Sequence, residues 1–233
     1  KGKLTKNILE TYTVERKDQV KKVIRLSMVA GLLASPRTKM SSFMSQSFLF
    51  FISKLPLIKK FIRGFHFKPG NKIKEGFILK KTQLKKKRVK QVFIGKQFPS
   101  AWLKALNGHK RVRSDELFKG QFCLFCFNLD PLSSFGEDTL KRWIKWGGKV
   151  AFIQKAMSLK TKSKFNKFDP SDLHKNSIWI DEKNELNSFR GRSSNIFIVR
   201  PDFIILNAGK AKGFRGGDSF IKESLSFLEK NRG

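Results

Sequence analysis

The chain has few of the residues that bind metals or form cross-links: it contains two cysteines and three histidines among 233 residues. His66, His109 and His174 stand apart from one another and from the cysteines, so four nearby zinc ligands are not expected. A GxGxxG turn for a dinucleotide is missing, and no Ser, His and acid grouping or pair of catalytic carboxylates stands out. We therefore predict no catalytic, cofactor-binding or metal-binding residue in this chain.

Long apolar runs are also missing. The most apolar stretch, residues 40–53, lies between Lys39 and Lys54, whereas a membrane-spanning helix needs about 20 apolar residues. We expect a buried or interfacial helix there, and no membrane span. The sequence opens on Lys1 without the pattern of a secretory signal, so we expect a cytoplasmic chain that is either a fragment or a processed product.

Acidic residues are scarce, because 18 Asp and Glu stand against 50 Lys and Arg, for a formal charge of +32. Such an excess is typical of proteins that bind nucleic acid or anionic membranes. The 50 cations comprise 37 Lys and 13 Arg spread over the whole length, whereas phosphate-binding proteins favour the bidentate guanidinium. A basic nucleic-acid-binding, ribosome-associated protein is therefore the alternative function.

Residues 66–91 are predicted to form a basic linker. Residues 67–71 are turn-forming, and Lys80 to Lys90 holds 7 cations in 11 positions. A polybasic patch for nucleic acid or anionic lipid is the functional alternative, but no aromatic residues are interleaved for base stacking. We prefer a solvated linker between two parts of the chain.

Cys123 and Cys126 form a CxxC inside an unbroken apolar run of strand length. Residues three apart in a strand point to opposite faces, so the two sulfurs should neither pair nor share a metal. A redox CxxC instead needs a helix N-terminus to lower its thiol pKa. We interpret the pair as core thiols.

The first 65 residues are predicted to be helical. Val20, Val23, Ile24 and Met28 recur at the spacing of one helix face, and Ser35-Pro36 should break that helix. The remaining expectations are a capping box of Asn7 and Glu10, a second helix over 41–53, and a third from Leu55-Pro56 to Gly64. The resulting wide apolar face requires a packing partner.

Residues 92–233 alternate strands with helices, which predicts an α/β domain. Strands are expected at 122–127, 150–153, 178–180, 196–199 and 203–206. Helices are expected at 137–146, closed by Gly147-Gly148, and at 220–228, capped by Asp218 or Ser219. Strand, helix and strand, then hairpin and helix, is the order that a five-stranded thioredoxin-like sheet needs, although other small α/β folds also fit.

Two further groups of residues invite a functional interpretation. Residues 213–218 are rich in glycine and precede a helix, but they follow no strand at the spacing of a dinucleotide fold. We interpret them as a flexible turn, with anion binding as the alternative. Asp130, Glu137 and Asp138 are interpreted as a loop acid and favourable charges at a helix N-terminus.

Several segments, in order and spacing, resemble the C-terminal half of FAD-dependent aromatic-ring monooxygenases of the 3-(3-hydroxyphenyl)propionate hydroxylase and phenol hydroxylase type. They are residues 9–16 with Tyr12, Glu15 and Arg16, residues 67–69 with Gly76, residues 95–103, residues 115–122, and residues 197–202. One departure concerns the turn, where Phe203 follows Arg200-Pro201-Asp202 in place of the family's glycine. With phenylalanine at this position the hairpin turn is not expected to have the family's geometry, because Phe resists the positive φ that Gly accepts.

The resemblance implies an enzyme that hydroxylates a phenolic ring with FAD, NAD(P)H and O2. The family's flavin-holding parts lie upstream of where this chain begins, so residues 1–65 would be the end of the flavin and substrate domain. Residues 92–233 would be a thioredoxin-like domain with a packing or subunit-contact role. We expect the chain alone to be inactive and to bind neither FAD nor NAD(P)H, with the missing flavin domain or another copy as its partner.

Overall fold

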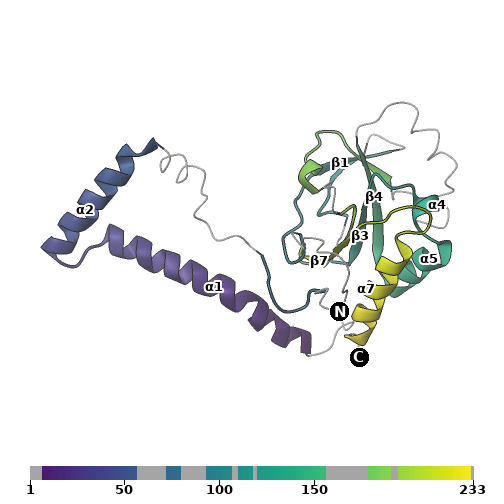
Figure 1. The fold of residues 1–233 in the computed structure, drawn as a ribbon, viewed down its shortest axis with the longest axis horizontal. Coiled ribbons are helices and arrows are strands. Elements are labelled where there is room, and N and C mark those ends of the chain that lie inside the picture. The colour runs from purple at the N-terminus through teal and green to yellow at the C-terminus, as the bar shows by residue number, and fades with distance from the viewer. Residues whose placement is uncertain are drawn as a thin grey trace. The chain divides into compact units, whose positions relative to one another are not determined.

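The computed structural model describes residues 7–56, 72–79, 93–106, 110–117, 120–155, 178–189 and 194–231. Contacts divide the chain into two compact units, Leu9–Gly76 and a second that comprises Phe77–Gly233 with Lys1–Ile8. In Figure 1 the first unit is drawn as two helices and the second as a sheet with helices.

The first unit contains helices α1 (Asn7–Ala34) and α2 (Lys39–Lys54). The break between them falls at Ser35-Pro36, as predicted. None of the described helices is both long and apolar enough to cross a membrane. The side chains of the predicted capping box, and residues 57–64 of the predicted third helix, lie outside the described part of the chain.

Glu15 and Gly76, which both belong to the segments that carry the resemblance, meet in this unit. Glu15 exposes 4% of its surface. Gly76 has a φ of +115°, and a Cβ on it would stand 2.2 Å from Glu15 Cγ. Glycine is thus required at this position both by the backbone angle and by the close approach of α1. Tyr12 is 60% exposed, with the Arg16 guanidinium 5.7 Å from its ring centre.

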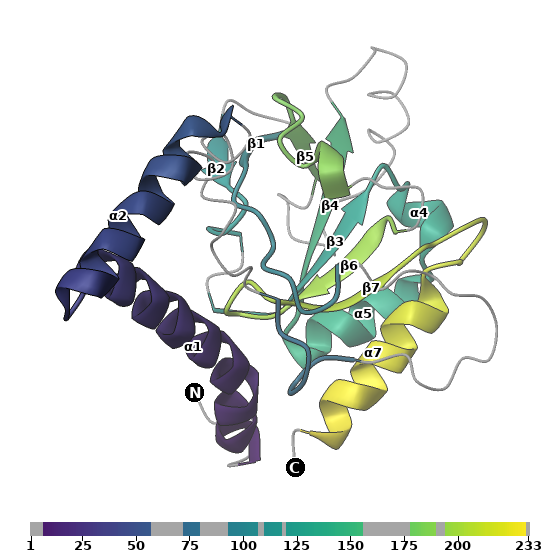
Figure 2. The same cartoon turned by 60° about the vertical axis from the view of Figure 1, so that its left-hand side comes forward.

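The second unit is built on a seven-stranded sheet in the order β2-β1-β5-β4-β3-β6-β7 (Figure 2). Strands β3, β4 and β5 are parallel to one another, whereas β1–β2 and β6–β7 are antiparallel pairs. The strand bounds are β1 Trp102–Ala105, β2 Arg111–Arg113, β3 Cys123–Phe127, β4 Lys149–Lys155, β5 Ile178–Asp181, β6 Ile196–Val199 and β7 Ile205–Gly209. The five predicted strands are present, and β1 and β2 correct the predicted number.

Both faces of the sheet are buried at β3 and β6, which explains why these two strands are apolar throughout. The helical elements are α4 (Pro131–Ser134), α5 (Glu137–Trp146), the 3-10 helix η1 (Asn187–Phe189) and α7 (Asp218–Lys230). Helices α5 and α7 contact each other and share a core with Leu124 and Cys126 of β3. Phe125 faces the opposite side, where its ring stacks on Phe98 with centroids 4.4 Å apart.

The predicted cap at the C-terminal end of α5 is confirmed, whereas the predicted cap at the N-terminal end of α7 is wrong. Gly147 closes α5 in the left-handed region, and its N–H donates to Ile144 O at 2.8 Å, as expected. At α7, however, neither predicted side chain caps the helix, because Gly217 occupies the N-cap without a side-chain hydrogen bond. The Asp218 carboxylate instead accepts the N–H of Gly136 at 2.8 Å. This contact ties the start of α7 to the start of α5.

The β6–β7 hairpin forms despite the phenylalanine in its turn. Phe203 has a φ of 67°, in the left-handed region that favours glycine. Its N–H donates to Arg200 O at 3.0 Å, and its carbonyl accepts the N–H of Phe98 at 2.7 Å. The residue is therefore part of the turn, and β7 begins at Ile205 instead of at residue 203.

Arg200 fastens a preceding segment to this hairpin. Its guanidinium contacts both carboxylate oxygens of Asp202, at 3.0 and 2.8 Å, and donates to Phe77 O at 2.9 Å. Beyond β7, the N–H of Leu79 donates to Leu206 O at 3.0 Å, and Gly95 and Lys96 exchange backbone bonds with Ile205. The outer side of β7 is therefore covered by the chain itself.

Candidate functional site

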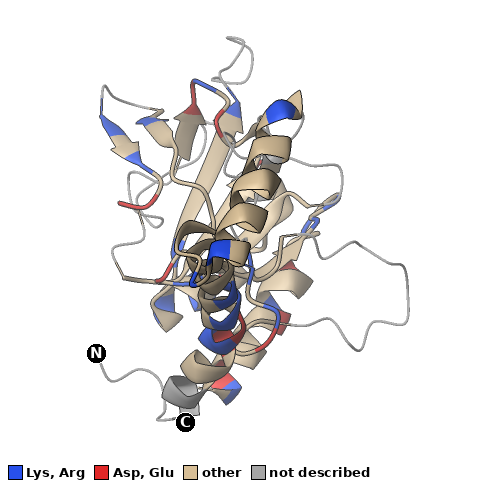
Figure 3. Ribbon diagram, turned by 90° about the vertical axis from the view of Figure 1, so that its left-hand side faces the viewer, with Lys and Arg blue, Asp and Glu red and all other residues tan. Residues whose placement is uncertain are grey.

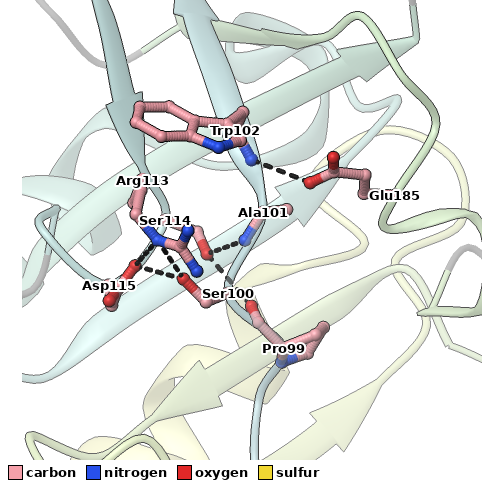
Figure 4. A network of polar contacts seen from close by, with 8 residues as sticks. All are labelled: Pro99, Ser100, Ala101, Trp102, Arg113, Ser114, Asp115 and Glu185. Carbon is pink, nitrogen blue, oxygen red and sulfur yellow. Dashed lines mark hydrogen bonds and ion pairs between the residues drawn. The ribbon is translucent and has the colours of Figure 1, made fainter.

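A network of polar contacts joins the segment before β1 to the end of β2 (Figure 4). The Ser114 hydroxyl donates to Pro99 O and accepts the N–H of Ala101, both at 3.0 Å. The N–H of Ser114 donates in turn to Ala101 O at 2.8 Å. Ser114 is fully buried, so its hydroxyl satisfies backbone groups and is not available to a substrate.

Ser100, Arg113 and Asp115 form the exposed half of this network. The Ser100 hydroxyl donates to Asp115 Oδ1 and accepts from Arg113 Nε at 3.0 Å. The hydrogen bond from Ser100, and to a lesser extent the charge of Arg113 3.5 Å away, hold the pKa of Asp115 below its ordinary value. Both contacts therefore stabilise the ionised form of Asp115.

Trp102 begins β1 at the edge of the network and is 43% exposed. Its backbone N–H donates to Glu185 Oε2 at 3.0 Å, and the Arg113 guanidinium lies 5.5 Å from the centre of the indole ring. In Figure 4 the indole lies beside Arg113 on the outer face of the β1–β2 pair. Trp102 also borders a hollow of about 200 Å³, whose other lining residues are Leu103, Arg111, Glu182 and Lys183.

Charges surround this hollow in pairs. Glu182 contacts Arg111 at 3.0 Å and Lys104 at 3.4 Å. The volume is below the roughly 300 Å³ at which ligand pockets usually begin. The hollow is thus suited to a single side chain and is too small for a flavin.

The glycine-rich turn at 213–218 does not fit a flavin pyrophosphate. A Cβ on Gly216 would stand 2.2 Å from the carbonyl oxygen of Lys212, and one on Gly217 would stand 2.1 Å from the Phe135 ring. The space that these glycines leave is therefore filled by the protein itself. The carboxylate of Asp218 adds negative charge where an anion would sit. Anion binding, the alternative considered above, has no support from this geometry.

The two thiols lie where the sequence places them. Cys123 and Cys126 are free, buried and in β3, and only Cys126 joins the core under α5 and α7. Burial raises the pKa of both thiols well above the ordinary value. The helix after β3 begins at Pro131, so neither thiol stands at a helix N-terminus. The prediction of two core thiols is confirmed.

The three acidic residues Asp130, Glu137 and Asp138 lie at or near the starts of helices. Glu137 and Asp138 lie in the first turn of α5, as predicted, and Asp130 O accepts the N–H of Ser134 at 3.0 Å. A hydrogen bond from Lys141, 2.6 Å away, lowers the pKa of Glu137. Among the residues that the structure describes, no three His, Cys, Asp and Glu side chains gather as metal ligands.

Other candidate residues lie outside the described ranges, namely the three histidines, Phe67-Lys68-Pro69 and the polybasic stretch Lys80 to Lys90. In the described part, basic and acidic positions are interspersed along both helices and strands (Figure 3). This distribution differs from the continuous basic stripe of a dedicated nucleic-acid surface.

Sequence reasoning missed the β1–β2 edge, although it singled out residues 95–103 for their resemblance. The usable signal is the alternation in Trp102-Leu103-Lys104-Ala105 and Arg111-Val112-Arg113, where every second residue is buried. Strands of four and three residues are too short for that alternation to stand out.

The topology defines the class of protein. Parallel strands β3 and β4 are joined through α5, the β6–β7 hairpin pairs with the other side of β3, and α7 then returns beside α5. This is the arrangement of a thioredoxin-like α/β domain, preceded here by helices α1 and α2. The predicted fold class is confirmed.

The chain belongs to the family described as the HcaD C-terminal domain, whose model matches residues 95–216. It is 26% identical over 202 residues to a 3-(3-hydroxy-phenyl)propionate/3-hydroxycinnamic acid hydroxylase of Klebsiella pneumoniae (strain 342), covering 86% of this chain and 34% of that protein. The corresponding hydroxylase of Comamonas testosteroni is 21% identical over 246 residues, covering 87% of this chain and 40% of that protein. The chain thus spans 34% and 40% of the length of these two curated relatives.

A solved structure of a flavin-dependent monooxygenase has a similar fold. The flavin-dependent monooxygenase PieE, determined in complex with FAD and substrate, matches 98% of this chain and 41% of its own length, with a TM-score of 0.55 and 16% identity. The resemblance inferred from the sequence is therefore confirmed: the chain is similar to the C-terminal part of such an enzyme.

Proposed function

We propose that this chain is the C-terminal part of a flavin-dependent monooxygenase that hydroxylates a phenolic ring with NAD(P)H and O2, and that it serves there in packing or subunit contact. The observation that carries the proposal is the likeness to PieE, which extends over 98% of the chain and so includes the helical unit. The relatives' names supply the substrate class, a 3-(3-hydroxyphenyl)propionate or a 3-hydroxycinnamate.

Exposed apolar surface on α1 and α2 supports a missing partner. The face predicted from the sequence carries Val20, Val23, Ile24 and Met28, and each of these side chains is more than half exposed. On α2 the exposed apolar residues are Met40, Phe43, Met44, Phe48, Leu49, Phe50 and Phe51. A contiguous apolar face of this kind marks an interaction surface. We assign its partner as the flavin and substrate domain that makes up the rest of the relatives' length.

For the thioredoxin-like domain we propose a packing role without redox chemistry. Its thiols are buried, on opposite faces of β3 and high in pKa. We further propose that residues 1–65 belong with the flavin domain, that residues 66–91 link the two parts, and that residues 92–233 form the domain. The contacts of Phe77 and Leu79 with the β6–β7 hairpin would anchor that linker.

A chimera tests this proposal. We would replace the C-terminal third of the Klebsiella hydroxylase with this chain and measure retained FAD and substrate-dependent NADH oxidation. We expect the chimera to retain flavin, the hydroxylase lacking its C-terminal third to lose it, and this chain alone to bind none. Stoichiometric FAD on this chain alone would contradict the proposal.

Two matched variants of the chimera test the assigned surface. Ile24→Asp places a charge on the exposed apolar face of α1, whereas Lys22→Asp changes an exposed residue two positions away. We expect Ile24→Asp to lower FAD retention strongly, because a carboxylate would be buried at the contact. Lys22→Asp should leave it nearly unchanged. Equal effects would refute the assignment of this face.

A further inference from the structure

The two edges of the sheet differ in how they are covered. At one edge, β7 forms backbone bonds with Leu79, Gly95 and Lys96. At the other edge, β2 pairs with β1 alone, and among the described residues none pairs with its outer side. An uncovered strand edge offers backbone donors and acceptors to another extended chain.

The hydrogen-bond pattern shows which groups of β2 are available. The N–H of Ala105 donates to Lys110 O at 2.9 Å, and the N–H of Ser114 donates to Ala101 O at 2.8 Å. Inward and outward groups alternate along an antiparallel strand, so the backbone groups of Arg111 and Arg113 point outward. The carbonyl of Arg113 accepts the N–H of Glu116 at 3.0 Å. Among the described residues, no backbone group bonds the N–H or carbonyl of Arg111 or the N–H of Arg113, so these three groups can bind another strand.

We propose that the β2 edge is a docking site for an extended, acidic segment of another polypeptide, which adds a strand beside Arg111–Arg113. Main-chain bonds of this kind supply affinity without strict sequence requirements. The charge of the partner follows from Lys110, Arg111 and Arg113, which flank the single apolar residue Val112. The side chains of Arg111 and Arg113 are 63% and 42% exposed and lie within reach of a neighbouring strand.

The hollow beside Trp102 adds a pocket to this edge. Trp102 pairs with Arg113 and Lys104 pairs with Arg111, so the four side chains share one face of the sheet. A side chain that projects from the added strand onto this face lies next to Arg111, at the rim of the hollow. The exposed indole and the volume of about 200 Å³ suit one apolar side chain of the partner.

Two other occupants of such an edge fit it less well. A second copy pairing antiparallel about Val112 would place Arg111 opposite Arg113, and like charges directly opposite are destabilising. A nucleic acid has no backbone that matches the outward N–H and carbonyl groups.

The test uses the full chain labelled with 15N and a short synthetic peptide of alternating Glu and Val. We expect titration to shift the amide signals of Arg111 and Arg113 and to slow their exchange with solvent. The same peptide with N-methylated backbone amides has equal charge but cannot complete the ladder. We expect its Kd to be about tenfold higher, because that change in binding free energy corresponds to the loss of roughly one to two hydrogen bonds.

Two variants separate backbone pairing from charge. Arg111→Val removes the cation and keeps the outward N–H, whereas Arg111→Pro removes both, and proline is tolerated on an edge whose N–H faces solvent. We expect the proline variant to bind the peptide about five- to tenfold more weakly than the valine variant. Equal binding of the N-methylated peptide, signal changes away from β2, or tighter binding of a single-stranded oligonucleotide at β2 would overturn the proposal. If Arg111→Pro unfolds, the peptide pair on the unsubstituted chain still decides.

Discussion

Replacing Phe203 should reveal the cost of its backbone angle. The residue holds a φ of 67° in the turn between β6 and β7. The left-handed region costs about 1–2 kcal/mol for a residue with a Cβ, and glycine adopts it without that cost. Phe203→Gly and Phe203→Ala both remove the ring, so their difference isolates the backbone.

The expected difference has an unusual sign. Glycine ordinarily destabilises by about 0.5–1 kcal/mol relative to alanine, because it loses more conformational freedom on folding. At residue 203 the relief of about 1–2 kcal/mol outweighs that loss. We therefore expect Phe203→Gly to be more stable than Phe203→Ala by about 0.5–1 kcal/mol, with the backbone bonds to Arg200 and Phe98 retained.

Urea unfolding followed by tryptophan fluorescence measures the difference, because all four tryptophans lie between Trp102 and Trp179, inside the sheet-containing unit. The control is Glu223, an exposed residue within α7, where glycine should be less stable than alanine by about 0.8–1 kcal/mol. If glycine is the less stable residue at both positions, then Phe203 does not occupy the left-handed region.

Three other predictions concern the core and the polar network. Ellman's reagent should find no reactive thiol in the folded chain and two in urea, because Cys123 and Cys126 are buried with raised pKa values; a fast reaction under native conditions would contradict this. Gly148→Ala should destabilise by about 1–3 kcal/mol in the same urea assay, because its Cβ would stand 2.2 Å from an indole atom, and unchanged stability would show that this contact is absent. Ser100→Ala should raise the pKa of Asp115 in a carboxyl NMR titration, since the lowered value depends first on the serine hydroxyl. Because that pKa is depressed, the contribution of Asp115 to stability is present above its unfolded pKa and is lost as the pH falls through the folded pKa. An unchanged pKa of Asp115 in Ser100→Ala would contradict the hydrogen bond from the serine.

Elements with a strong periodic pattern could be predicted from the sequence. Helix α5 has the predicted bounds, because its apolar face, its acidic first turn and Gly147 all indicate the same element. Strand β6 was equally clear as a short apolar run before a Pro-Asp turn. Local chemistry decided these elements, so no knowledge of tertiary contacts was needed.

Tertiary contacts decided the features that the sequence did not reveal. Asp218 has the residue type of an N-cap, yet its carboxylate binds Gly136 from a different part of the chain. Strands β1 and β2 are held by each other and by the Ser114 hydroxyl, and β1 also pairs with β5, which lies more than 70 residues further along the chain. The open β2 edge could not be predicted either, because an uncovered edge depends on where every other strand lies.

The position of β3 inside the sheet, with a partner strand on each side, has a consequence for biosynthesis. Cys123 to Cys126 pair on one side with Lys149 to Phe152 and on the other with Ile196 to Val199. The second side stays unpaired until the ribosome has made β6 and the hairpin that follows it. Because pairing between such distant residues is slow, we expect the nascent Phe-rich strand to be the segment most in need of a chaperone.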